Sequence, residues 1–175
     1  MLQNQDIQLR AIEPSDLDFI YKLENDTEVW RVGNTLIPYS KFQIEQYVLN
    51  TQHDLFSERQ LRLMLDKVTP GMKNVPIGAL DLYDFDPYHK RAGIGIIIIP
   101  EEREKGFARE ALTLLKKYCF EILDLHQLYC SITEGNTASI HLFETCGFTQ
   151  CGTRKDWRFL DGGFKDELLF QLIKQ

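Results

Sequence analysis

The sequence predicts an α/β domain in which strands and helices alternate along one chain. With 175 residues, 43% of them hydrophobic, the chain is long enough to bury one core. The apolar run AGIGIIIIP (92–100) is typical of a strand buried on both faces, and a helix with one apolar face follows at 104–123. No repeat, low-complexity tract or linker divides the chain, so we expect a single domain over residues 1–175.

The N-terminal part predicts a strand followed by two helices. The segment IQLRAI (7–12) alternates apolar and polar residues, as a half-buried strand does. Ser15 and Asp18 form a capping pair that opens a helix to about residue 23. A second pair, Ser40 and Gln43, opens a helix to about residue 50, after the irregular segment RVGNTLIP.

The middle of the chain predicts three strands. QLRLMLD (60–66) and VPIGALDLYDF (75–85) are strand-like, and the Pro-Gly pair in KVTPGMKN between them indicates a turn. The third strand is the apolar run at 92–100, which Pro100 ends because proline cannot donate to a sheet ladder.

The C-terminal part predicts a strand, a helix and a hairpin. QLYCSIT (127–133) is the strand, and Asn136 caps a short helix that ends at Gly147. Strand-like runs at 149–159 and 164–173 are joined by Asp-Gly-Gly, a hairpin turn signal.

Charge and composition exclude several functions. The formal net charge of −6 and the lack of any Lys/Arg-rich block argue against a nucleic-acid surface and favour a cationic partner. No apolar stretch approaches the ~20 residues that a membrane span needs, and MLQNQDIQ does not resemble a signal peptide. We therefore expect a cytoplasmic protein.

The four cysteines, Cys119, Cys130, Cys146 and Cys151, form no CxxC pair and no regular spacing with histidine. This pattern supports neither a metal site nor a redox motif, and reduced thiols are expected. Cys119 and Cys130 are interpreted as small core residues.

The segment EEREKGFAREA (101–111) has two interpretations. A strand that leads directly into a helix brings free backbone N–H groups and the positive end of the helix dipole to one point, which suits a phosphate. Gly106 and Ala108 leave room for such an anion, and Arg103, Lys105 and Arg109 supply charge. Alternatively, this is an ordinary amphipathic helix whose first-turn glutamates suit the dipole and whose glycine is incidental.

The same segment resembles a known family. Arg103-Glu-Lys-Gly106-Phe-Ala108 is similar to the R/Q-x-x-G-x-G/A acetyl-coenzyme-A motif of the GNAT N-acetyltransferases. Asn136-Thr-Ala-Ser139, followed by Cys-Gly-Phe (146–148), resembles their N-x-x-[AS]…GF signature. Both ends of the chain resemble the branch that contains the ribosomal-protein alanine acetyltransferases and spermidine acetyltransferase.

The resemblance implies a mixed, mostly antiparallel, splayed sheet of about seven strands with about four helices on its two faces. It implies acetyl transfer from acetyl-CoA to an amine that attacks the thioester directly, with no covalent enzyme intermediate. The main chain of the central strand would hold the donor's pantetheine arm and polarise its carbonyl. The cofactor-binding residues it implies are Ile96, Ile97, Ile98, Arg103, Glu104, Lys105, Gly106, Phe107, Ala108, Arg109, Asn136, Ser139 and Phe143.

Two glycines depart from the pattern of the spermidine-type relatives. Gly93 stands where they have a glutamate, and Gly95 where they have a glutamine. Asp84 matches another active-site glutamate of these relatives, with Asp81 and Asp86 nearby. We expect Asp84 to bind or deprotonate the amine, although loop aspartates are commonly turn formers.

A third departure concerns the leaving group. The family's tyrosine, which protonates the departing thiolate, corresponds to Phe143, which has no proton to donate. Since a thiol pKa is about 8.5, coenzyme A leaves without much help, and positioning alone could suffice. Cys146 or Tyr129 are alternative donors.

The implied acceptor is a small polyamine-like primary amine of the spermidine/spermine class. One alternative is a protein N-terminus. The other is a non-catalytic acyl-CoA-binding module, which has no acceptor. An acidic pair of polyamine-type relatives is replaced by Leu36 and Ile37. Trp30, Tyr39 and Phe42 are candidates for lining the acceptor cleft. Relatives in this branch assemble into oligomers, so a homo-oligomer is also expected.

Overall fold

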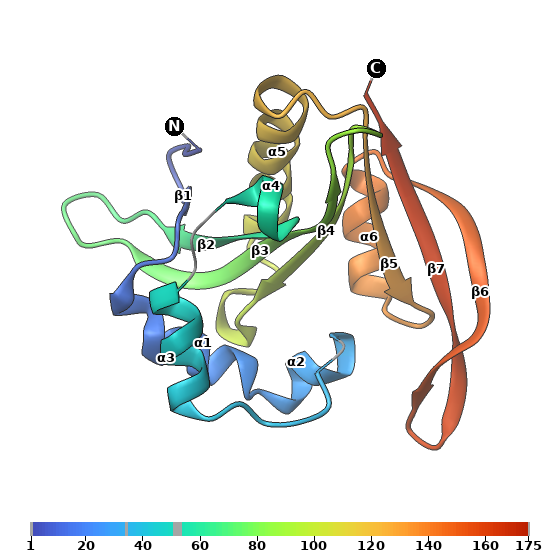
Figure 1. Cartoon of the computed structure of the whole chain (residues 1–175), viewed down its shortest axis with the longest axis horizontal. Helices are drawn as coiled ribbons and strands as arrows, with labels where there is room; N and C mark the ends of the chain where they lie inside the picture. The colour runs from blue at the N-terminus through green and yellow to red at the C-terminus, as the bar shows by residue number, and fades with distance from the viewer. Residues whose placement is uncertain (1, 34, 51–53, 175) are drawn as a thin grey trace.

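In the computed structural model, which describes residues 2–33, 35–50 and 54–174, one seven-stranded sheet runs through the molecule (Figure 1). The strand order is β1-β2-β3-β4-β5-β7-β6, and every neighbouring pair is antiparallel except β4 and β5. This confirms the mixed, mostly antiparallel sheet. The strands are β1 Ile7–Arg10, β2 Leu61–Lys67, β3 Val75–Asp86, β4 Arg91–Ile98, β5 Gln127–Thr133, β6 Thr149–Leu160 and β7 Gly163–Ile173.

The described residues form six α-helices, more than the four or so expected. Two short ones, α2 and α4, were not predicted, because helices of six and four residues give no apolar stripe in the sequence. Each begins after an aspartate, Asp26 or Asp54, whose carboxylate accepts a backbone N–H of the first turn. The helices are α1 Leu17–Glu24, α2 Thr27–Val32, α3 Lys41–Asn50, α4 Leu55–Glu58, α5 Phe107–Lys117 and α6 Thr137–Thr145.

The capping pair predicted before α1 is wrong. Ser15 lies inside a short 3₁₀ turn, Pro14–Asp16, and the reciprocal capping bonds join Glu13 and Asp16. The Glu13 N–H donates to Asp16 Oδ2 at 2.8 Å. The capping role falls to Asp16 because its side chain is turned inward, toward Arg10.

Arg10 ties β1 to β2 and to the turn before α1. Its guanidinium donates to both oxygens of Asp16, at 2.7 and 2.8 Å, and to both oxygens of Asp66, at 2.6 and 3.0 Å. The two aspartates are 2% and 3% exposed. Burial alone would raise the pKa of Asp16, but the hydrogen bonds from Arg10 and from the Glu13 N–H outweigh it, and the pKa lies below its ordinary value.

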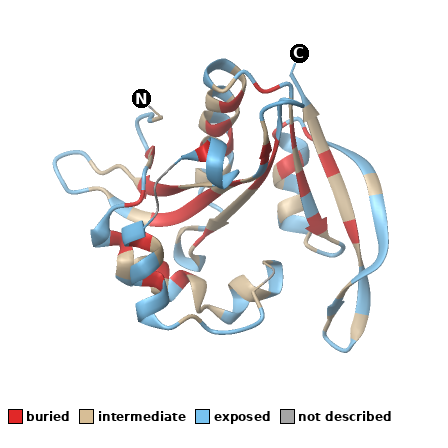
Figure 2. Cartoon of the chain, in the orientation of Figure 1, coloured by how far each residue is buried: buried red, intermediate tan, exposed pale blue. Residues whose placement is uncertain are grey.

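Helices cover both faces of the sheet, and each face has its own core (Figure 2). The larger core lies under α5 and α6, where Cys119 and Cys130 are 0% and 3% exposed, which confirms their predicted place. The smaller core lies under α1 and α3 and is made of Ile12, Ile20, Ile44, Val48 and Met64. All four cysteines are free thiols.

The sheet splits between β4 and β5. These parallel strands pair only where Arg91–Gly93 meets Gln127–Tyr129. Beyond that point β4 pairs with β3 alone, and β5 with β7 alone. The structure therefore contains the splay that the family resemblance implies, and Gly93 opposite Tyr129 is the last pair before the strands separate.

The C-terminal hairpin has the predicted turn. Asp161 and Gly162 connect β6 to β7, and their φ angles of 52° and 79° are the positive values that favour Asp-Gly in a two-residue hairpin turn. The hairpin extends well beyond β5 (Figure 1). Its outer part reaches the end of α2, where Arg158 Nη2 donates to the carbonyl of Gly33 at 2.5 Å.

Among the described residues, none of the helices combines the length and apolar character that a bilayer crossing requires. The same residues contain no group of three or more His, Cys, Asp or Glu side chains placed to hold a metal ion.

Candidate active site

The loop between β4 and α5 differs from the predicted helix start. The sequence predicts a helix from Glu104, but α5 begins at Phe107. Glu104 and Gly106 have φ angles of 61° and 87°, which an α-helix cannot contain. The chain makes a 3₁₀ turn over Pro100–Glu102 and then this left-handed bend, which ends with Gly106 as the N-cap of α5.

Backbone N–H groups are available at this bend. The first helical hydrogen bonds of α5 come from Arg109 and Glu110, which both donate to the Gly106 carbonyl, at 3.1 and 3.2 Å. The N–H groups of Phe107 and Ala108, which directly precede these two residues, have no acceptor within the helix. The position that a Cβ would occupy at Gly106 is open, with no contact within 4 Å. The bend therefore presents N–H donors at a helix N-terminus, where an anion can approach.

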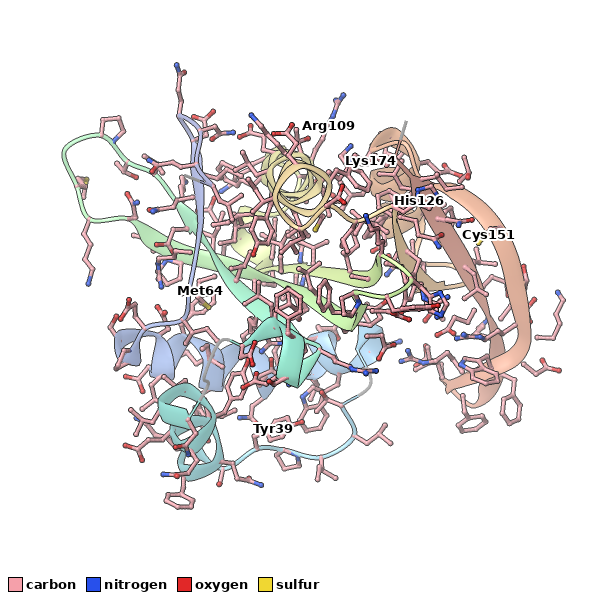
Figure 3. The ribbon with its side chains drawn as sticks, turned by 45° about the horizontal axis from the view of Figure 1, so that its top comes forward. Tyr39, Met64, Arg109, His126, Cys151 and Lys174 are labelled. Carbon is pink, nitrogen blue, oxygen red and sulfur yellow. The ribbon has the colours of Figure 1, made fainter. Side chains whose placement is uncertain are left out.

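The charged side chains around the bend are partly committed to protein partners. Arg103 Nε donates to the carbonyl of Ile98 at 2.9 Å. Lys105 and Lys67 both contact Glu102, at 3.0 and 3.2 Å, and the hydrogen bond from Lys105 is the main reason why the pKa of Glu102 is lowered. Arg109 is exposed on α5, on the opposite side of the molecule from Tyr39 (Figure 3).

The main-chain groups of the β4 isoleucines point alternately toward β3 and toward the gap between β4 and β5. The Ile99 N–H donates to Ile77 of the β3 side at 2.9 Å, and main-chain groups of successive strand residues point to opposite sides. The N–H and C=O groups of Ile97 therefore face β3, whereas those of Ile96 and Ile98 face the gap that β5 leaves. The Ile98 carbonyl accepts from Arg103, whereas the strand pairings of the described residues give Ile96 no partner strand on the gap side.

Helix α6 contributes Asn136, Ser139 and Phe143. Asn136 is the N-cap, and its Oδ1 accepts the Ser139 N–H at 3.2 Å. Phe143 is 4% exposed and packs edge-on against Phe148, with ring centroids 5.1 Å apart. Phe143 is thus a core residue. Cys146 is also buried, and burial raises the pKa of its thiol.

This packing gives a prediction for the missing tyrosine. Phe143→Tyr is expected to lower the free energy of unfolding by about 1–3 kcal/mol, because it places a hydroxyl in a filled core. It is expected to leave turnover within about threefold of the wild-type value, far from the ~10²–10⁴ that a general acid supplies. Urea denaturation and steady-state kinetics measure the two effects. A gain in turnover of tenfold or more would contradict the prediction.

A cavity of about 580 Å³ opens on the α1–α3 side of the sheet, bounded also by α4. Glu24, Glu58 and Asp81 line it together with a single cation, Arg62. Arg62 donates to both oxygens of Asp81, at 2.7 and 3.0 Å, and to Glu24. Three carboxylates against one guanidinium leave the cavity with excess negative charge. Its other lining residues include Tyr39, Tyr47 and Tyr83.

Of the aromatic residues proposed for the acceptor cleft, only Tyr39 lines this cavity. Phe42 is 67% exposed, and Trp30 donates its indole N–H to the Glu24 carbonyl at 2.6 Å. Leu36 and Ile37 are exposed. The sequence analysis missed Glu24 and Arg62, whose only signal was the alignment of β2 and β3 that places Arg62 opposite Asp81.

Asp84 lies outside that cavity, at an irregular point of the β3–β4 hairpin. The strand register shifts between Tyr83 and Asp86, and Asp84 has a φ of 48°. It lines a second cavity, of about 620 Å³, with Tyr129. The Tyr129 hydroxyl donates to Asp84 Oδ2 at 3.4 Å. Asp86 also lines this second cavity, where it pairs with Arg91, whereas Asp81 lies in the first cavity, where it pairs with Arg62.

The split sheet, the N–H groups at the start of α5 and the acidic cavity together are what a transferase needs to hold an acyl-coenzyme-A donor beside an amine acceptor. A model of the acetyltransferase (GNAT) domain matches residues 6–149. The chain belongs to this family of acetyltransferases.

Relatives are similar in sequence and structure to this chain over nearly its whole length. The spermidine N(1)-acetyltransferase of Vibrio cholerae is 33% identical over 164 residues, which cover 93% of this chain and 90% of that one. The Escherichia coli K12 enzyme of the same name is 29% identical and covers 93% and 83%. A crystal structure of the Vibrio cholerae spermidine N-acetyltransferase with CoA and spermine superposes with a TM-score of 0.83, at 30% identity, over 97% and 96% of the two chains.

Proposed function

We propose that this protein transfers an acetyl group from acetyl-CoA to a primary amine of a polyamine such as spermidine or spermine. The observation that carries the proposal is the acidic cavity beside the point where β4 and β5 separate. Its excess negative charge suits a flexible cation, and its tyrosines offer apolar surface to methylene chains. The relatives named for spermidine acetylation support the same acceptor class.

The donor would lie along the gap between β4 and β5. Its pyrophosphate would contact the N–H groups of the bend at 103–109, with Arg103, Lys105 and Arg109 around it. The exposed main-chain groups of Ile96 would hold the pantetheine arm, and Ser139 at the start of α6 would face it from the other side. The reaction is direct attack of the amine on the thioester carbon, so positioning supplies most of the acceleration.

Two steps need proton transfer. The acceptor enters as an ammonium with a pKa near 10.4 and must lose a proton before it attacks. We assign this role to Asp84, which is connected to the gap between β4 and β5 through its hydrogen bond from Tyr129. The leaving thiolate needs no dedicated acid, because a thiol pKa of about 8.5 makes it a good leaving group, and Phe143 offers none.

The test is free-thiol release from acetyl-CoA with separate acceptors: spermidine, spermine, a diamine, an amino sugar and a peptide with a basic N-terminus. Turnover with the polyamines and not with the peptide supports the proposal. Turnover with the peptide alone identifies a protein N-terminal acetyltransferase. Binding of acetyl-CoA by calorimetry without thiol release from any acceptor identifies a non-catalytic acyl-CoA-binding module.

The proposal also covers the domain organisation, the cellular compartment and the oligomeric state of the enzyme. Residues 1–175 would act as one domain in the cytoplasm, with free thiols as that compartment requires. A solved form of the Vibrio cholerae enzyme is dodecameric. Self-association of this chain is supported by large apolar side chains that are exposed at the end of α2, just after it, and on the C-terminal hairpin: Val32, Leu36, Ile37, Trp157, Phe159 and Phe164.

A further inference from the structure

Two tyrosines meet at the closed end of the gap between β4 and β5. Tyr129 stands on β5 opposite Gly93, in the last residue pair before the strands separate. Its neighbours Leu128 and Cys130 point into the core under α5 and α6, so Tyr129 points to the opposite face, where the acidic cavity opens. Tyr83 lines that cavity and contacts Tyr129, so the pair of tyrosines lies between the cavity and the gap.

Gly93 makes room for the second tyrosine. Tyr83 pairs with Gly93 across β3 and β4, and a Cβ at position 93 would overlap the Tyr83 ring. The Tyr83 ring meets the Tyr129 ring edge-on, at 5.9 Å between centroids and 89° between planes. The aromatic contact fixes the direction in which the Tyr129 hydroxyl points. The glycine that replaces the relatives' glutamate is thus a packing requirement of Tyr83.

The Tyr129 hydroxyl is linked to a carboxylate in contact with solvent. It donates to Asp84 Oδ2 at 3.4 Å, and Asp84 is exposed at the hairpin bulge. This distance is longer than the usual ~2.8 Å, as catalytic hydrogen bonds often are before the substrate tightens them. Tyr83 borders the acidic cavity, whereas Tyr129 and Asp84 border the second cavity. The tyrosine pair therefore separates the acceptor's cavity from a route to solvent.

We propose that Tyr129 is a catalytic residue that relays a proton from the acceptor ammonium to Asp84, and that Tyr83 is a positioning residue for it. This inference rests on the proposed acetyltransferase function. As the ammonium N–H proton passes to the Tyr129 oxygen, the Tyr129 proton passes to Asp84 Oδ2, and Asp84 releases it to water. The neutral amine then forms the C–N bond as the C–S bond breaks, and its second proton goes to the departing sulfur, giving the amide and free coenzyme A.

The deciding variant is Tyr129→Phe, which keeps the ring contact with Tyr83 and removes only the hydroxyl. We expect kcat with spermidine to fall about 10²-fold, at the lower end of what proton-transfer groups supply, while the KM for acetyl-CoA changes less than about twofold. Asp84→Asn is expected to lower kcat by a comparable factor. The double variant is expected to be no slower than the slower of the two single variants, because the two groups act in one proton-transfer chain. Tyr88→Phe, at an exposed position on the same hairpin, is the control and keeps wild-type rates.

A second measurement separates proton transfer from a packing effect. A weakly basic acceptor, such as hydroxylamine or glycinamide, needs little help to lose its proton. The loss in Tyr129→Phe is therefore expected to be about tenfold smaller with such an amine than with spermidine. For Tyr83, the phenylalanine variant keeps most of kcat because it keeps the ring, whereas Tyr83→Ala and Gly93→Ala lower kcat with little change in the KM for acetyl-CoA.

Some outcomes overturn the inference and leave the function intact. If the wild-type protein acetylates polyamines and Tyr129→Phe keeps more than half of kcat, the relay does not exist. The same holds if the variant loses the same factor with strongly and weakly basic amines. If the wild-type protein releases no thiol with any amine, the proposed function itself fails, and no variant is needed to show it.

Discussion

Arg10→Met is expected to lower the free energy of unfolding by about 3–5 kcal/mol, because it leaves two buried carboxylates without their partner. Arg10 donates to all four oxygens of Asp16 and Asp66, and within the described residues no other cation forms an ion pair with either carboxylate. Since β1, β2 and the turn before α1 all meet at this guanidinium, the loss affects the edge of the sheet and the helix beside it. Urea denaturation of both proteins measures the difference.

The pH dependence of this loss has a definite sign. The pKa of Asp16 is depressed in the folded protein, so the stability it contributes is complete above the unfolded value of about 3.9 and is lost as pH falls through the lower folded value. The variant lacks the guanidinium, the main group that depresses this pKa. The stability of the wild-type protein should therefore fall more steeply below about pH 4 than that of Arg10→Met.

A matched control separates this network from charge removal in general. Arg31→Met breaks an ion pair with Asp161 whose side chains are 53% and 67% exposed, and the expected cost is at most about 1 kcal/mol. The triple variant Arg10→Met, Asp16→Asn, Asp66→Asn should recover part of the loss, because no buried charge remains. Equal losses for Arg10→Met and Arg31→Met would contradict the assignment.

Gly106→Val is expected to raise the KM for acetyl-CoA by about 10- to 100-fold. Gly106 has a φ of 87°, which a β-branched residue adopts only at a cost of about 1–3 kcal/mol, and relief of that strain turns the first N–H groups of α5 away from the phosphate. The expected effect on kcat at saturating donor is small, since the acceptor side is unchanged. Steady-state kinetics with varied acetyl-CoA gives both constants.

Gly71→Val supplies the control for strain. Gly71 has a φ of 75° in the loop between β2 and β3, with open space around it, as Gly106 has. The backbone cost should be similar, so the two variants should lose similar unfolding free energy. Only the change at Gly106 should affect the KM. A comparable rise in KM for Gly71→Val would mean that general destabilisation, and not the bend before α5, is responsible.

The sequence predicted the elements that local chemistry specifies. The strand at 127–133 has the predicted bounds, and the pair Ser40 and Gln43 caps α3 reciprocally, at 2.8 and 3.2 Å. Both follow from neighbouring residues alone. The start of α5 did not, because positive φ angles at Glu104 and Gly106 leave no clear mark in a charged, helix-favouring segment.

The sequence singled out the residues before α5 that we propose for the donor, but it did not predict the acidic cavity. A motif in one continuous stretch of sequence named residues 103–109, although the bend that they form was predicted as helix. The carboxylates of the cavity come from α1, α4 and β3, and only the pairing of β2 with β3 brings Arg62 to Asp81. Similarly, Gly93 was read as a missing glutamate. That Tyr83 fills the space depends on the register across the β3–β4 hairpin and its bulge.

The three residue pairs between β4 and β5 also determine how the molecule deforms. They are the only ladder that joins the β1–β4 leaf of the described sheet to the β5–β7 leaf. Each leaf is stiffened by its own antiparallel ladders, so the softest internal coordinate is the dihedral angle between the leaves, with the short ladder as its axis. A small rotation about that axis widens the open end of the gap and leaves the end at Gly93 and Tyr129 in place. It breaks no hydrogen bond within either leaf.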